Sequence, residues 1–133
     1  MLQRDVRNTM TQHAGVVRSE EGLTAGLAEL SAIEARMDAI GVHPDIAGYQ
    51  DLAHAFDLKS SALAARATME AALERRETRG AHNRSDYPEL DPSLQVNLVW
   101  SGPGKVERES IAPIPAEIAA KMREVTSAGK LVE

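Results

Sequence analysis

The feature that most constrains the fold is a long run rich in alanine and leucine, which begins between Asp45 and Gln50 and continues to Arg79. Alanine has the highest helix propensity, and on a buried face it lets neighbouring helices approach closely. The run therefore predicts one long helix within a helical bundle, with Gly80 as the C′ residue that ends it in a positive-φ conformation. The bulky members of this helix are Leu52, Phe56, Leu63 and Leu73.

Two shorter helices are predicted before the long one. The first has an apolar face at spacings of four, three and four residues, formed by Val6, Met10, His13 and Val17. Ser19 is expected to cap the second helix, with Glu20 and Glu21 at its positive end. Gly41 is expected to end that helix, and Pro44 cannot continue it. The apolar stripe of the second helix consists of Leu23, Leu27, Leu30, Ile33, Met37 and Ile40.

The hydrophobic period changes to two near residue 94, which indicates a strand. One face of this strand is formed by Leu94, Val96, Leu98 and Trp100. The Gly102-Pro103-Gly104 segment predicts a turn, and Lys105 to Ile111 can return as the second strand.

A last amphipathic helix is predicted near the end of the sequence, with Pro115 in its first turn and Gly129 at its end. Its apolar face consists of Ile114, Ile118, Met122 and Val125. The sequence therefore predicts a mainly α protein. A three-helix bundle of the spectrin-repeat type occupies residues 1–92, and a small β-hairpin and a C-terminal helix (93–133) are appended to the same single domain.

Composition excludes several classes of function. The chain has 133 residues, enough for one domain, and its formal charge of −5 argues against nucleic acid as a partner. It has no cysteine, which excludes disulfides, cysteine-ligated zinc and iron–sulfur ligation within this chain. No apolar run approaches the roughly 20 residues of a transmembrane segment, and the N-terminus lacks the apolar core of a signal peptide. We therefore expect a soluble protein in a reducing compartment.

Three further patterns favour structural roles over chemistry. The segment from Ser101 to Lys105 joins two strands and lacks the spacing of a phosphate-binding loop. No pair of histidines has the spacing of a zinc-binding helix, so we expect no metal site from His13, His43, His54 and His82. The carboxylates beside Pro88 and Pro92 are expected to accept hydrogen bonds in loops: Asp86, Glu89 and Asp91.

A dense group of polar side chains lies in the segment from Arg75 to Pro88. It places two guanidinium groups, an imidazole and a carboxylate within eight residues: Arg79, His82, Arg84 and Asp86. One interpretation is a local network in which arginines bridge carboxylates and the carbonyls at the end of the helix. The other is that some of these groups face another domain or a bound anion, because arginine recognises such groups through two hydrogen bonds.

The same segment, Arg-x-Glu-Thr-Arg-Gly-Ala-His-x-Arg-x-Asp-Tyr-Pro, resembles the signature of the C-terminal domain of succinate dehydrogenase and fumarate reductase flavoprotein subunits. L-aspartate oxidase is a relative of that family. Two further matches lie at Met10 to Leu23 and at Asp51-Leu52, so the resemblance covers about residues 3 to 110 in the correct order. The family's Trp/Phe-Leu-Lys-His-Thr segment is replaced here by Leu94 to Trp100, and no Gly-x-Gly-x-x-Gly follows a strand. The flavin-binding domain of the family is therefore missing from this sequence.

The resemblance implies a domain that packs on the FAD domain of a parent enzyme that interconverts succinate and fumarate. FAD and an iron–sulfur subunit would then be the cofactor and partner of the parent, which would be cytoplasmic, at the inner face of the membrane through its complex. The chain itself would contain no catalytic, cofactor-binding or metal-binding residue and would be inactive alone. The resemblance implies that the packing surface on the flavin domain includes Arg79, His82, Arg84 and Asp86. The alternatives are a stand-alone helical protein-interaction module and a small anion-binding protein that uses the arginine cluster.

Overall fold

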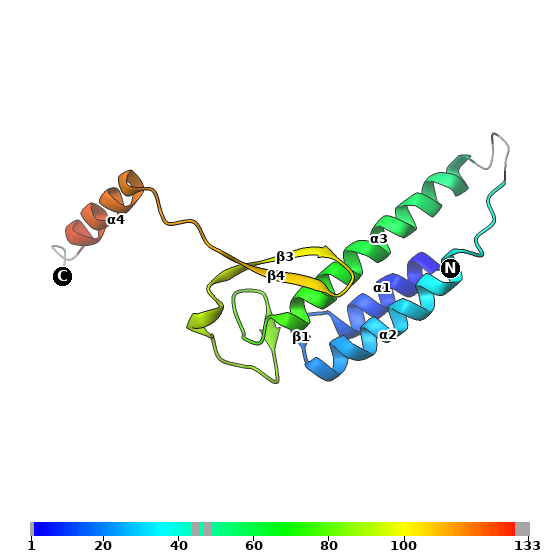
Figure 1. Ribbon diagram of the computed structural model, residues 1–133, viewed down its shortest axis with the longest axis horizontal. Coiled ribbons are helices and arrows are strands. Elements are labelled where there is room, and N and C mark those ends of the chain that lie inside the picture. Colours follow the sequence, from blue (N-terminus) through cyan, green and yellow to red (C-terminus); the bar gives the residue numbers. More distant parts are fainter. Residues whose placement is uncertain (1, 44–45, 47–48, 130–133) are drawn as a thin grey trace.

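The computed structural model describes residues 2–43, 46 and 49–129, and the side chains among them up to residue 123. Three helices pack side by side and form the body of the molecule (Figure 1). They are α1 (Leu2–His13), α2 (Glu20–Met37) and α3 (Tyr49–Glu74). The mainly helical fold predicted from the sequence is confirmed.

Short strands and one more helix complete the fold. The strands β1 (Val17–Arg18) and β2 (Asn83–Arg84) pair in parallel, and a 3-10 turn, η1, covers Pro92–Leu94. The antiparallel hairpin of β3 (Val96–Gly102) and β4 (Lys105–Ser110) follows, and then α4 (Ala116–Gly129). The predicted hairpin and C-terminal helix are therefore present. None of the described helices is both long enough and apolar enough to cross a membrane.

The core lies between the three bundle helices, and alanine supplies much of the α3 side of it. Its buried members are Val6, Ala14, Leu23, Leu30, Ile33, Met37, Leu58, Ala62, Ala65, Met69 and Ala72. The helices approach closely at Gly26, where an added Cβ would lie 2.7 Å from Cβ of His13 and 2.9 Å from Sδ of Met69. A glycine in the middle of α2 therefore permits α1 and α3 to contact it at one place.

The start of α2 follows the prediction, but its end does not. The Ser19 hydroxyl accepts a hydrogen bond from the Gly22 amide at 3.1 Å, as expected of an N-cap. The helix ends at Met37, so Ile40 lies beyond it and is partly exposed. The expected break at Pro44 lies outside the described residues.

Two predicted helix ends are wrong. α1 ends at His13, and Val17 lies in β1 with 59% of its surface exposed. The chain turns at Gly15, where an added Cβ would lie 2.8 Å from the Thr11 carbonyl oxygen. α3 begins within the predicted range but ends at Glu74, five residues before Arg79.

Gly80 is consequently not the C′ residue of α3. It has the expected positive φ of 57°, but it occupies a tight turn in which Arg79 and His82 form a β-bridge. The bulky α3 residues Leu52, Phe56 and Leu63 are exposed, since the buried face of the helix carries mainly alanine.

The alternation predicted for the first strand is present in β3, and the hairpin lies against α3. The indole Nε1 of Trp100 and the amide of Gly104 both donate to Oε2 of Glu70, at 2.7 and 2.8 Å. The first strand starts at Val96, because Leu94 is buried in η1, which the Asp91 side chain caps. The second strand ends at Ser110, one residue before the predicted end.

α4 is separated from the rest of the molecule. Residues 111–115 form an extended arm, and α4 lies apart from the bundle at its end (Figure 1). The Pro115 carbonyl accepts hydrogen bonds from the amides of Ile118 and Ala119, and α4 begins at Ala116, so Pro115 lies one residue before the helix and not in the first turn that was predicted for it. The side chain of Val125, predicted on the apolar face, lies outside the described residues.

Candidate functional site

The segment after α3 is organised around the guanidinium of Arg84, which is fully buried. Its Nη1 donates to three carbonyls at the end of α3, namely those of Ala72 at 2.8 Å, Leu73 at 3.3 Å and Arg75 at 3.3 Å. The last carbonyls of a helix have no partner within the helix and carry partial negative charge. Arg84 therefore caps α3 from a position ten residues beyond its end.

Asp86 is the counter-charge of Arg84 and links it to α2. Its two carboxylate oxygens accept from Nε and Nη2 of Arg84 at 2.8 and 2.7 Å, which is the bidentate geometry of a strong pair. Oδ2 also accepts from the amide of Glu20, at the N-terminus of α2, at 2.8 Å. The pKa of Asp86 is held well below its usual range, chiefly by Arg84, and the pKa of Arg84 is raised by the same pair. One ion pair thus joins the negative end of α3 to the positive end of α2.

A second buried charge, Glu77, joins the segment to the loop that leads into η1. Its carboxylate accepts from Arg79 Nε at 2.8 Å, Arg75 Nη1 at 2.6 Å and the Asp91 amide at 2.9 Å. Arg79 is the largest cause of a pKa that is lowered to about 2, against the opposing effect of burial. Arg75 also donates to the carbonyls of Leu94 and Val96. Glu77 is therefore ionised at neutral pH and fixes both arginines.

His82 connects the same segment to β1. Nδ1 lies 3.1 Å from Nη1 of Arg18, and Nε2 lies 3.0 Å from the Arg75 carbonyl oxygen. An arginine can only donate and a carbonyl can only accept, so Nε2 carries the proton and Nδ1 accepts. Burial lowers the pKa of His82 and the nearby arginines lower it further, so the ring is neutral at pH 7. Arg18 also donates to the Gly15 carbonyl, and Ser85 donates to the Arg18 carbonyl.

The predicted local network is thus confirmed, and the four motif residues lie close to one another. The structure adds three members to which the sequence interpretation assigned no role in it: Arg18, Arg75 and Glu77. The alternation of Arg75, Glu77 and Arg79 was a signal for the buried carboxylate, because residues two apart in extended chain share a side. Arg18 lies in the segment from Met10 to Leu23 that resembles the family, and it pairs with Arg84 in the sheet of β1 and β2.

The chemistry that this cluster can perform is limited. The motif side chains donate to or accept from groups within the chain. Among residues 2–43, 46 and 49–129, no group of three His, Cys, Asp or Glu could hold a metal ion. The strands of this same part of the chain form two two-stranded sheets, without the strand, glycine-rich loop and helix that hold a dinucleotide.

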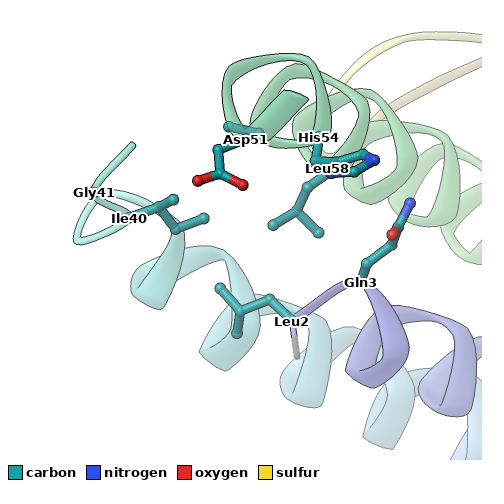
Figure 2. A pocket seen from close by; sticks show the side chains of 8 residues that line it. Leu2, Gln3, Ile40, Gly41, Asp51, His54 and Leu58 are labelled. Carbon is teal, nitrogen blue, oxygen red and sulfur yellow. The ribbon is translucent and has the colours of Figure 1, made fainter. Parts of the chain in front are cut away.

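Open cavities lie on the bundle, away from the motif. One of about 420 Å³ opens where the start of α3 faces the start of α1 and the end of α2 (Figure 2). Leu2, Ile40 and Leu58 form its apolar floor, and Gln3, Asp51 and His54 form a polar rim. This cavity is open and shares no residue with the motif, so the two features are separate surfaces.

Comparison with known proteins places this arrangement in a family. The family described as "Fumarate reductase flavoprotein C-term" matches residues 3–124. An uncharacterized FAD-dependent oxidoreductase of Methanocaldococcus jannaschii is 34% identical over 101 residues, which is 76% of this chain and 18% of that protein. The L-aspartate oxidase of Rhodospirillum rubrum is 38% identical over 88 residues, 66% of this chain and 26% of that protein. The succinate dehydrogenase flavoprotein subunit of Rickettsia bellii is 35% identical over 102 residues, 76% of this chain and 17% of that subunit.

The same fold occurs in a solved structure. Mycobacterium smegmatis Sdh1 in complex with UQ1 superposes with a TM-score of 0.76 at 22% identity, covering 91% of this chain and 22% of that one. The chain thus spans about a quarter or less of the length of the relatives it matches. The match over residues 3–124, together with the relatives that share the motif region, shows that the chain belongs to the C-terminal domain family of fumarate reductase and succinate dehydrogenase flavoproteins.

Proposed function

We propose that this chain is the C-terminal helical domain of a flavoprotein that interconverts succinate and fumarate, and that it packs on an FAD domain outside this sequence. Family membership and the greater length of the relatives support the proposal. The observation that carries it is the motif cluster, in which buried charges fix a polar loop at one end of the bundle. A rigid surface loses little conformational entropy on binding, which suits a docking role.

The four motif residues would contribute to docking in different ways. Arg79 and Asp86 keep part of their side chains exposed and His82 is half-buried, so these three can contact a neighbouring domain. Arg84 is fully buried and would act through the position of Asp86. In the parent, an iron–sulfur subunit would be the further partner, and the complex would lie at the inner face of the membrane.

The chain alone is expected to be inactive, because its charged groups are engaged with one another and its described strands form two two-stranded sheets rather than a dinucleotide-binding sheet. The test is an assay of the purified 133-residue protein with FAD, succinate and an artificial electron acceptor. Turnover that depends on added FAD would contradict this part of the proposal.

Docking is tested by binding the chain to the flavin-binding portion of the same parent reading frame, produced separately. Arg79→Ala and His82→Ala should each weaken the complex by about tenfold or more, as expected for contacts near the centre of an interface. Arg36→Ala is the matched control, since Arg36 forms an exposed ion pair with Asp5 on the bundle. Circular dichroism of each variant shows whether the fold is kept. Wild-type affinity for the Arg79 and His82 variants would show that the motif is not the docking surface.

A stand-alone interaction module is the second candidate. It is favoured by the exposed apolar residues at the opposite end of α3, Tyr49, Leu52 and Phe56, the last with 64% of its surface exposed. The reading frame separates the two candidates. An in-frame dinucleotide-binding domain upstream supports the flavoprotein domain, whereas a start codon at Met1 with no such domain supports the module.

A further inference from the structure

The first turn of α4 and the arm before it carry exposed isoleucine side chains. Ile118 lies in the first turn of α4 and Ile114 lies in the arm before it, and each has more than half of its surface exposed. Ile111, in the arm, is exposed as well. The charged residues Glu117, Lys121 and Arg123 are also exposed. An amphipathic helix normally buries its apolar face against another element, so this face indicates a partner.

The exposed apolar residues at the start of α3, which include Phe56, cannot be that partner within the same chain. The hairpin runs along α3 from Glu70, which binds Gly104, to Glu74, which binds Arg108, and so it leads away from Phe56. From Glu74 back to Phe56 the helix extends about 27 Å. The five residues of the arm can span about 17 Å at most. The apolar face of α4 is therefore out of reach of this surface.

The arm is also a feature of the longer relatives. The family match extends to residue 124, and the superposition with Mycobacterium smegmatis Sdh1 covers a larger share of the chain than the residues up to Ser110 provide. Part of the arm and α4 therefore has a counterpart in a chain about four to five times as long. In such a longer chain, residues outside the C-terminal domain are available to pack against the arm and α4.

We propose that the apolar face of α4 packs on the flavin-binding portion of the parent protein and forms a second attachment point, separate from the motif. The proposal rests on the proposed function, because it names the same partner domain. The motif attaches the bundle through charged and polar groups, and the arm and α4 attach through isoleucines. The polar side of the helix, with Lys121 and Arg123, stays in water.

The test compares two matched substitutions in the same binding measurement, using the full chain and the separately produced flavin-binding portion. Ile118→Asp places a charge on the α4 face and should weaken the complex by about tenfold or more, since a buried isoleucine contributes at least that factor. Leu63→Asp makes the same kind of change at an equally exposed aliphatic residue, 53% against 51% exposed, on the bundle helix α3. It should leave the affinity unchanged.

The outcomes separate this inference from the proposed function. Weakening by Arg79→Ala with wild-type affinity for Ile118→Asp would overturn the α4 contact and keep the docking domain. Equal weakening by Ile118→Asp and Leu63→Asp would also overturn it, as would an isolated chain that dimerises through α4 in sedimentation. Absence of any binding by the wild-type chain would reject the docking function itself. As a second readout, amide hydrogen exchange in α4 should slow when the flavin-binding portion is added, and unchanged exchange in a formed complex would contradict the contact.

Discussion

At the residue scale, the carboxylate of Glu77 determines how the segment after α3 responds to acid. Arg79, Arg75 and a backbone amide lower its pKa to about 2 from the usual 4.5. An acid whose pKa is lowered by folding stabilises the native state above its unfolded pKa, and this stabilisation is lost as the pH falls through the folded pKa. We expect the free energy of unfolding to fall between about pH 5 and pH 2, with Asp86 contributing in the same direction.

Replacement of this carboxylate should be costly at neutral pH. Glu77→Gln is expected to lower the free energy of unfolding by about 3 kcal/mol, because two arginines lose a buried counter-charge. The variant should also lose less stability than the wild type between pH 5 and pH 3. Urea denaturation at several pH values measures both effects. Glu107→Gln, on the exposed side of β4, is the control and should behave as the wild type. Equal stability of Glu77→Gln and wild type at pH 7 would show that the Glu77 carboxylate is not a stabilising counter-charge of the two arginines.

At the element scale, the contact among the three bundle helices depends on the absence of a side chain at one position of α2. Gly26→Ala should lower the free energy of unfolding by about 1 to 3 kcal/mol, even though alanine favours a helix, because the added Cβ would overlap His13 and Met69. Thermal unfolding followed by circular dichroism measures the change. Gly41→Ala is the matched control, since an added Cβ there meets no atom within 4 Å. A stabilised Gly26→Ala variant would show that the helices can move apart at little cost.

The attachment of the hairpin to α3 depends on Glu70, which accepts hydrogen bonds from Trp100 and Gly104. Glu70→Ala should shift the fluorescence of Trp100 to longer wavelength, because the indole becomes more exposed to water. Trp100 is the single tryptophan in the sequence, so the signal is specific. Glu74→Ala removes an exposed pair with Arg108 on the same hairpin and should leave the emission unchanged. The same shift in both variants would mean that the hydrogen bonds of Glu70 are not what holds Trp100 against α3.

The sequence predicts elements better than their ends, and the reason is physical. The cap at Ser19 and the alternation from Val96 to Trp100 are local signals, and both appear as predicted. The end of α3 depends on Arg84, which returns from ten residues later to bind the last carbonyls, and no local pattern encodes that contact. Burial of Glu77 likewise depends on the amide of Asp91, which lies 14 residues later in the chain, and on the arginines on either side of it. The four motif residues and the kind of network they form could be predicted from the sequence, but the partner of each side chain could not.

At the scale of the whole molecule, the hairpin and α4 should contribute unequally to stability. We propose that residues 1–92 and 93–133 form one domain, in which the hairpin is integral and α4 is an attachment. Removal of residues 111–133 should leave the melting temperature of the bundle unchanged, because the arm leads away from it. Removal of residues 95–133 should lower it, because Arg75 and Glu70 lose partners on β3. A large loss of stability in the shorter deletion would show that α4 supports the bundle.

The ion pair of Arg84 and Asp86 also has a consequence for synthesis of the protein. The end of α3 and the start of α2 both receive a cap from residues that follow them in the chain. A ribosome releases α1, α2 and α3 in order, and the helices can begin to pair at that stage. The bundle is closed at this end only after Asp86 has emerged. Completion of the fold during translation is therefore timed by a residue that belongs to none of the three helices.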